Sequence, residues 1–311
     1  MKLTNFAKYA WGVLLYNLLV VLWGAYVRAT GSGAGCGSHW PLCNGVVLPR
    51  SPNIETVIEF VHRLTSGLAL VLVIILVLWA WRAYPRRHNV RLGAGLSLVF
   101  VITEALVGAG LVLFEWVAND ASTARVVSMA IHLINTFLLL ASLTLTAWWA
   151  SGGEPVVLHG HGIGLWLFVF AFLSVLALSV FGAMTALGDT LFPVRSLGEG
   201  ILQDFTPTAH FLVRLRVWHP LIAIVVGVFL GALSILLLMF RANPLIHRFV
   251  RLLTAFFVLQ LVAGLVNLLL LAPVWMQLVH LLLADTVWII LVLLAVTNFA
   301  ESEVCQDARP A

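Results

Sequence analysis

The chain has 311 residues, of which 62% are hydrophobic and only 10% are charged, and its mean hydropathy is +1.06. Soluble domains carry about 25% charged residues, so this composition excludes an ordinary water-soluble protein. The net charge of +4 is no sign of nucleic-acid binding, because most of the basic residues lie in short connections between apolar blocks.

Eight apolar blocks predict eight membrane-spanning helices, since about 20 residues cross about 30 Å of hydrocarbon. They begin near Tyr9, Phe60, Gly95, Val126, Gly164, Val217, Leu252 and Met276. The first block is longer than the apolar part of a signal peptide, about 7–15 residues, and is expected to be retained. The expected fold class is therefore an all-α integral membrane protein.

Basic residues predict the orientation of these helices. With the N-terminus inside, the inner segments hold 10 Lys and Arg and the outer segments hold 7, a bias in the direction of the positive-inside rule. The clearest inner connections are Tyr84–Arg91 and Arg241–Arg251, which are basic and contain no acidic residue. We expect a multi-pass protein of the cell's inner (plasma) membrane with both termini in the cytoplasm.

Two cysteines share a glycine-rich connection between the first two spans. The predicted orientation places Cys36 and Cys43 on the outer side, where an oxidising environment lets disulfides persist. Glycines and a proline supply the turns that bring the two sulfurs together. A disulfide is the favoured interpretation, and two free thiols, or metal ligands together with His39, are the alternatives. Cys305, near the C-terminus, is expected to stay reduced.

Short matches recur at corresponding places in the first four and the last four spans, which predicts duplication of a four-helix unit. The matching segments are Gly24-Ala25-Tyr26 with Gly182-Ala183-Met184, Glu104–Gly108 with Gln260–Gly264, His62-Arg63-Leu64 with His219-Pro220-Leu221, and His132-Leu133 with His280-Leu281. A unit with an even number of spans keeps its orientation, so an axis along the membrane normal is expected. Residues 1–150 and 151–311 should form two pseudo-symmetric four-helix bundles.

Four of the ten histidines lie a few residues inside even-numbered spans: His62, His132, His219 and His280. These spans run in one direction, so the four are expected at one depth near the outer face. Ionisable residues within spans usually face the bundle interior for a function, although an interhelical hydrogen bond is the alternative for any single histidine. The repeat divides them two and two. Two imidazoles facing across a bundle suit a haem, whereas zinc or copper would favour carboxylate or thiolate partners.

A carboxylate and several arginines lie near these histidines. Glu59 stands three residues before His62 and is expected on the same helix face, where it is a candidate acid–base group. The alternative is contact with water or with Arg63. Because Glu59 lies at a span entrance, its removal is expected to leave folding intact. The second half has Arg216 at the equivalent place. Arg63, Arg214 and Arg216 are placed either to meet haem propionates or to snorkel to lipid headgroups.

Small residues also flank the histidines along the spans. A flat macrocycle could approach the backbone at these glycines, and ordinary close helix packing is the alternative. They are Gly67, Gly108, Gly110, Gly182 and Gly264.

These motifs resemble those of the haem A synthase family, and the resemblance covers essentially the whole chain. It rests on four segments: the glycine-rich loop 30–45, 59–67, 132–137 and 271–285. The resemblance implies an oxidoreductase that converts the C8 methyl of haem O to a formyl group, giving haem A for assembly of the terminal cytochrome oxidase. The implied partners are the substrate haem O, haem O synthase and an electron donor, all in a lipid bilayer.

The resemblance also implies roles for the histidines. His62 and His132 are implied to hold the iron of the substrate haem in the N-terminal half. His219 and His280 are implied to be the axial ligands of a resident haem b in the C-terminal half.

Further residues follow the family pattern, with one departure. The resemblance implies that Glu59 is catalytic and that Cys36 and Cys43 form a disulfide. Glu104 stands where the family usually carries glutamine, whereas Gln260 keeps the pattern in the second half. A carboxyl at mid-span is expected to be protonated or hydrogen-bonded, and it is either a structural group or a proton relay.

Two other functions fit parts of the sequence. A diheme b-type electron-transfer cytochrome of the membrane would use both histidine pairs as permanent sites, and Glu59 would then be incidental. A transporter would use the repeat for alternating access, but such folds usually interrupt their helices at the binding site.

Overall fold

The computed structural model describes residues 3–157, 160 and 162–300, and this part of the chain is helical apart from turns, loops and two isolated β-bridges. In chain order the elements are α1 (Asn5–Ala29), η1 (Ser32–Ala34), α2 (Ile54–Ala83), α3 (Asn89–Leu113), α4 (Thr123–Ala150), α5 (Ile163–Leu191), α6 (Leu197–Asp204), α7 (Phe211–Leu215), α8 (Trp218–Phe240), α9 (Pro244–Leu269) and α10 (Val274–Asn298).

Eight segments of the described residues are long and apolar enough to cross a membrane, which confirms the predicted number and the all-α membrane class. Seven of them are single helices: α1, α2, α3, α4, α5, α9 and α10. The remaining span, Phe211–Phe240, combines the short α7 with α8.

Several helices begin one or two turns before the predicted start, because their first turns are polar. Thr4 caps α1 by accepting a hydrogen bond from the backbone N–H of Ala7, 3.1 Å away. Asn53 caps α2 in the same way, through the N–H of Thr56. Side-chain caps satisfy backbone donors that have no partner in the first turn. Hydropathy follows the apolar core of a span and therefore misses these capped turns.

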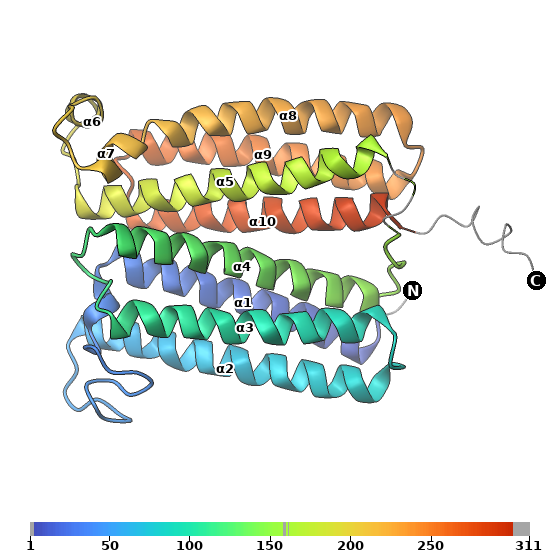
Figure 1. Ribbon diagram of the computed structural model, residues 1–311, viewed down its shortest axis with the longest axis horizontal. Helices are drawn as coiled ribbons and strands as arrows, with labels where there is room; N and C mark the ends of the chain where they lie inside the picture. The colour runs from blue at the N-terminus through green and yellow to red at the C-terminus, as the bar shows by residue number, and fades with distance from the viewer. Residues whose placement is uncertain (1–2, 158–159, 161, 301–311) are drawn as a thin grey trace, which may run out of the picture.

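The long helices lie side by side in two groups (Figure 1). The first group is α1 to α4, and the second is α5, α8, α9 and α10. α2, α4, α8 and α10 all begin at the end of the molecule where α6 and α7 lie, and the N-terminus lies at the opposite end (Figure 1). This common direction agrees with the predicted repeat. The symmetry axis and the domain boundary at residue 150 remain predictions.

One apolar core joins the two groups. Trp288 of α10 stacks on Phe137 of α4, with ring centroids 5.0 Å apart, and its indole N–H donates to the Phe137 carbonyl at 2.8 Å. Phe172 of α5 meets the same indole edge-on. A single cluster of buried apolar side chains therefore runs from α1 to α10.

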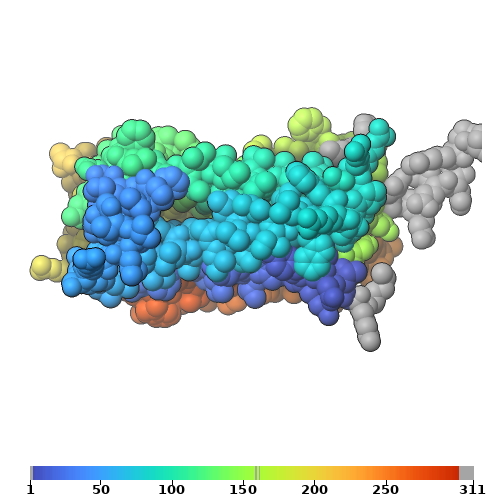
Figure 2. Space-filling view, turned by 90° about the horizontal axis from the view of Figure 1, so that it is seen from below, coloured from blue at the N-terminus to red at the C-terminus, as the bar shows by residue number. Residues whose placement is uncertain are grey.

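The connection between α1 and α2 forms a compact cap at one end of the first group. Figure 2 shows this loop raised above the surface near the start of α2. Gly35 lies so close to the Glu55 backbone that a Cβ at this position would clash with it. The Thr56 hydroxyl donates to the Gly35 carbonyl at 2.6 Å. The loop is thus fixed on α2 directly above the first predicted site.

Candidate functional site

The four histidines lie near the starts of α2, α4, α8 and α10, at one end of the molecule (Figure 1). The Nδ1 atom of each ring is buried and makes no well-formed hydrogen bond in the described part of the chain, although the Leu178 backbone approaches His219 and Glu104 approaches His132. Leaving such an atom unsatisfied costs about 1–3 kcal/mol. Each ring therefore keeps a polar nitrogen without a well-formed bond to the described protein atoms, which suits rings that a bound group other than protein would orient.

The two histidines of the second pair lie close enough together to share a metal ion. The ring centroids of His219 and His280 are 6.2 Å apart, and the ring planes are nearly perpendicular, at 85°. Metal–imidazole bonds are about 2.0–2.1 Å long, so one ion fits between rings at this separation. In the first half, His62 and His132 are close enough to interact electrostatically. Among the described residues, no three or more His, Cys, Asp or Glu side chains gather closely enough to hold a metal ion.

Each histidine packs against a glycine of the preceding long helix, a pattern that occurs four times. A Cβ on the glycine would lie 3.0 Å from the ring of His62 at Gly24, 3.8 Å from His132 at Gly108, 2.9 Å from His219 at Gly182, and 3.0 Å from His280 at Gly264. By contrast, a Cβ at Gly67 or Gly110 would meet no described atom within 4 Å. The repeated glycines therefore make room for the imidazoles, a role that neither sequence interpretation included.

Glu104 and Gln260 occupy matching places beside the second histidine of each pair. The Oε1 atom of Glu104 lies 3.4 Å from Nδ1 of His132. The Nε2 atom of Gln260 lies 3.2 Å from Nε2 of His280. Glu104, the glutamate that stands where the family usually carries glutamine, thus lies beside a histidine of the first pair.

Glu59 is buried and both of its carboxylate oxygens have partners, which argues against the expectation that its removal leaves folding intact. The residue is only 3% exposed. One carboxylate oxygen accepts from the backbone N–H of Cys36 at 2.7 Å, and the other accepts from the Arg63 guanidinium. The contact with Arg63 that the sequence left as an alternative is therefore present. Glu59 connects α2 to the disulfide loop.

Two of the three arginines considered for propionates already have partners. Arg63 also donates to the carbonyls of His39 and Leu42. Arg216 forms an ion pair with Asp189 at 3.0 Å and donates to two backbone carbonyls. Arg214 is exposed, with a single long hydrogen bond of 3.4 Å to a carbonyl, and lines a groove of about 520 Å³. Arg214 is thus the best placed of the three to meet an outside anion.

The ion-pair network around Arg216 reaches the helix α6. Asp204, the last residue of α6, lies 3.7 Å from the Arg216 guanidinium. Burial raises the pKa of the Asp204 carboxyl, and the charge of Arg216 offsets part of this rise. This network holds the connection between α5 and α8 above the second histidine pair.

Arg28 joins the two helix groups at the same end, which the sequence analysis missed. From the last turn of α1, its guanidinium donates to the Ala186 carbonyl at 2.8 Å and to the Thr190 hydroxyl at 3.1 Å, both on α5. It also donates to Oε1 of Gln277 on α10 at 2.8 Å. Gln277 stands three residues before His280, so Arg28 ties the first half to the entrance of the second site.

A disulfide links Cys36 and Cys43 in the loop above α2, with both cysteines buried. Glu59 holds the backbone N–H of Cys36. The sequence interpretation of His39 as part of a metal site is not needed to account for the two sulfurs. Cys305 lies outside the described residues.

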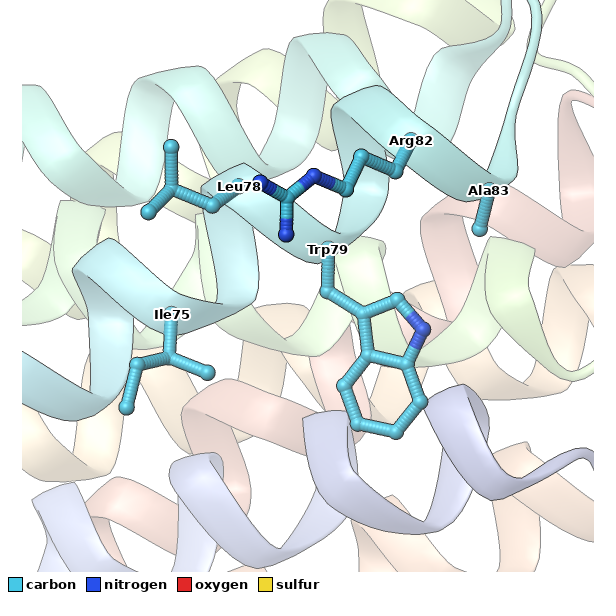
Figure 3. A pocket seen from close by; sticks show the side chains of 5 residues that line it. All are labelled: Ile75, Leu78, Trp79, Arg82 and Ala83. Carbon is cyan, nitrogen blue, oxygen red and sulfur yellow. The ribbon is translucent and has the colours of Figure 1, made fainter.

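An open groove of about 660 Å³ lies at the other end of α2, away from the histidines. Figure 3 shows its lining residues, Ile75, Leu78, Trp79, Arg82 and Ala83, all from this one helix. Its position at the end of α2 near the N-terminus separates it from the candidate site.

Comparisons with known proteins agree with the family suggested by the motifs. A family model described as COX15-CtaA, cytochrome oxidase assembly protein, matches residues 7–292. The chain is 40% identical over 132 residues to a Heme A synthase of Exiguobacterium sp., covering 41% of this chain and 43% of that protein. It is 47% identical over 97 residues to the Heme A synthase of Halalkalibacterium halodurans, covering 31% and 33%.

Another relative carries a different name. The chain is 56% identical over 275 residues to a Protoheme IX farnesyltransferase of Thermus thermophilus, covering 88% of this chain and 45% of that protein. The matched segment thus spans less than half the length of each of these relatives. The family match, in contrast, extends through all eight spans of this chain. The chain therefore belongs to the COX15-CtaA family of cytochrome oxidase assembly proteins.

Proposed function

We propose that this protein is a haem A synthase, which oxidises the C8 methyl of haem O to a formyl group for assembly of the terminal oxidase. The observation that carries the proposal is the fourfold arrangement of an unsatisfied histidine packed on a glycine, two in each half. A family of cytochrome oxidase assembly proteins supplies the biological setting. Conversion of a methyl to an aldehyde removes four electrons, through two hydroxylations and loss of water from the gem-diol.

We assign the two histidine pairs to different haems. His62 and His132 hold the substrate haem O, and His219 and His280 hold a haem b. When bound, the haem b supplies one-electron transfer between the substrate site and an outside electron acceptor or donor. Glu59 serves as the proton-handling group of the first site, held in place by Cys36 and Arg63. General acid–base assistance of this kind contributes about 10²–10⁴-fold.

The Thermus relative supports a farnesylated haem as the substrate. Its printed name describes farnesyl transfer to protohaem, but this chain matches only 45% of it. We assign farnesyl transfer to the remaining part of that protein, because the part that it shares with this chain corresponds to a chain that matches the oxidase assembly family. In the Thermus relative, the part that matches this chain is joined to the part that we assign to farnesyl transfer. The matching part is therefore well placed to use the farnesylated haem as its substrate. Haem O synthase is accordingly the proposed partner here.

The direct test is haem chromatography. Cells that make haem O and express this chain are expected to accumulate haem A, and cells without the chain are expected to stop at haem O. Expression of His62→Ala to the same level serves as the control for a loss at the substrate site. Accumulation of haem O alone by cells that hold the folded, membrane-inserted chain would overturn the proposed activity.

A diheme electron-transfer cytochrome is the second candidate. It is favoured by one observation, that both oxygens of Glu59 are occupied by the loop and by Arg63. This candidate predicts that the purified chain binds haem b in both halves even when haem O is supplied. Haem extraction distinguishes it from the synthase, which is expected to retain one haem O or haem A per chain.

We also propose that both termini lie in the cytoplasm and that the protein resides in the plasma membrane. The histidines, the disulfide and α6 would then lie on the outer side. The division into halves at residues 1–150 and 151–311 is part of the same proposal.

A further inference from the structure

The two halves differ most clearly at one position beside the second histidine of each pair. Glu104 on α3 lies beside His132, and Gln260 on α9 lies beside His280. A carboxylate offers two acceptor oxygens, whereas an amide offers one acceptor oxygen and a donating NH₂ group. Equivalent positions therefore place chemically different groups beside the second histidine of each pair, Glu104 at Nδ1 of His132 and Gln260 at Nε2 of His280.

The Glu104 carboxylate is held by polar side chains of α3 and α4. Asn135 Nδ2 and Thr136 Oγ1 donate to its two oxygens. The Thr103 hydroxyl donates to the Asn135 amide oxygen at 2.6 Å, and Asn135 also donates to the Phe100 carbonyl at 2.9 Å. Asn135 is 9% exposed and Thr136 is 5% exposed, so these are interior contacts.

No such set of donors accompanies Gln260. The residues three and four positions after the second histidine are Asn135 and Thr136 in the first half, but Leu283 and Ala284 in the second. The residue before the carboxylate is Thr103, whereas Leu259 precedes Gln260. The first half therefore offers side-chain donors to a carboxylate at this position, and the second half does not offer them to Gln260.

A histidine that binds a metal normally donates its other ring N–H to an acceptor, which fixes the ring and increases its electron donation. Nδ1 of His132 is buried, and Glu104 Oε1, at 3.4 Å, lies nearby without yet forming a hydrogen bond by geometry. Binding of a haem iron through Nε2 would leave the Nδ1–H free to donate to this carboxylate.

We propose that Glu104 is a positioning residue of the N-terminal haem site. Its carboxylate accepts the Nδ1–H of His132 and makes this imidazole a stronger electron donor to iron than its counterpart His280. The inference rests on the proposed binding of haem O at His62 and His132. Stronger donation stabilises the ferric state, so the haem of the first half has a lower midpoint potential than it would have beside glutamine. A difference at this one side chain thereby gives the two haems different midpoint potentials.

The test is a reciprocal exchange between the halves. Glu104→Gln gives the first half the amide of the second, and Gln260→Glu gives the second half the carboxylate of the first. Each full-length variant is purified with haem O supplied, and the midpoint potential of each haem is measured by redox titration of the visible spectrum. The iron–histidine stretching band is measured by resonance Raman spectroscopy of the reduced protein.

Glu104→Gln is expected to shift the potential of the N-terminal haem to more positive values and to lower the frequency of its iron–histidine band. Gln260→Glu is expected to shift the C-terminal haem in the opposite direction, and this measurement stands even if Glu104→Gln accumulates poorly. Asn135→Leu, which copies the second half, should reproduce part of the Glu104→Gln shift because it releases the carboxylate.

Two failures are distinguishable. If His132→Ala retains haem O with an unchanged spectrum, the proposed haem site itself is wrong. If His132→Ala loses haem O, but Glu104→Gln leaves both the potential and the Raman band unchanged, only the role of Glu104 is overturned.

Discussion

At Glu59, burial and ion pairing decide what a substitution does to the protein. Glu59→Ala would leave the Arg63 guanidinium and the Cys36 N–H without their partner. Breaking a buried ion pair by removing one member costs about 3–5 kcal/mol. We therefore expect a clearly lower melting temperature for purified Glu59→Ala, and a smaller loss for Glu59→Gln, which keeps a hydrogen-bond acceptor.

The matched control for this prediction is Glu55→Ala. Glu55 is an exposed acid in the first turn of the same helix, so its removal should hardly change the melting temperature. Equal melting temperatures of wild type and Glu59→Ala would mean that the carboxylate contributes nothing to the loop. Activity of Glu59 variants must accordingly be compared per folded protein.

The contact between glycine and histidine gives a second prediction for single residues. Gly182→Ala places a Cβ at 2.9 Å from the His219 ring, closer than a methyl group can approach without moving it. The ring is expected to shift, so the purified protein should hold less C-terminal haem or none. The visible spectrum measures this haem content. Gly231→Ala on α8, where a Cβ meets no described atom within 4 Å, is the control and should keep the haem.

Single-residue partners were the least predictable part of the site. Helical spacing placed Glu59 near His62, but it did not show that the carboxylate is held between the Cys36 N–H of the loop and Arg63 of the same helix. That loop follows a left-handed glycine, Gly31, and irregular turns, and its path has no periodic signal in the sequence. The Glu104 contacts with Asn135 and Thr136 involve two helices whose rotation about their axes hydropathy does not determine.

For the helices, the sequence was sufficient to find each span and insufficient to find its ends. Blocks of about twenty apolar residues are required by the thickness of the bilayer, and all eight correspond to helices. The short α6 and α7 were not predicted, because eight and five residues are too few for a hydropathy or periodicity signal.

Arg28 makes a testable connection between helices of the two groups. Its guanidinium holds α5 and α10 from the end of α1 through three hydrogen bonds. Hydrogen bonds to charged groups contribute about 1.5–3 kcal/mol, so Arg28→Gln should lower the melting temperature of the whole protein. It should also loosen the second site, since Gln277 loses its partner near His280.

Arg50→Gln is the control for Arg28, because Arg50 is exposed in the loop before α2. Thermal unfolding followed by circular dichroism measures the first effect, and haem retention after repeated washing measures the second. If Arg28→Gln and Arg50→Gln unfold at the same temperature, the contact between the groups depends on the apolar core alone.

At the scale of the whole molecule, the two halves should hold their haems independently. His219→Ala or His280→Ala should remove most of the haem b that purifies with the protein, because each deletes an axial ligand. His62→Ala should leave that haem b in place, because its ring belongs to the other pair. Pyridine haemochrome spectra of the purified variants measure the haem content. Equal loss of haem b from all single variants would require one shared site.

The repeat was detectable in the sequence because the halves kept their glycines and histidines together. Gly24 and Gly182 match in the sequence and contact matching histidines in the structure. The connection between the halves was not detectable in this way. Arg28, and Phe137 with Trp288, meet residues more than a hundred positions away, and a contact at that distance leaves no pattern in a single sequence.

All four histidines lie at one end of helices that run in the same direction, and this placement has an electrical consequence. A charge that crosses the whole bilayer gains or loses about 2.3 kcal/mol for each 100 mV of transmembrane voltage. An electron that passes between the two proposed haems moves in the plane of the membrane, at nearly constant depth, so the voltage does almost no work on it. Exchange between the sites should therefore proceed at the same rate in energised and in depolarised cells.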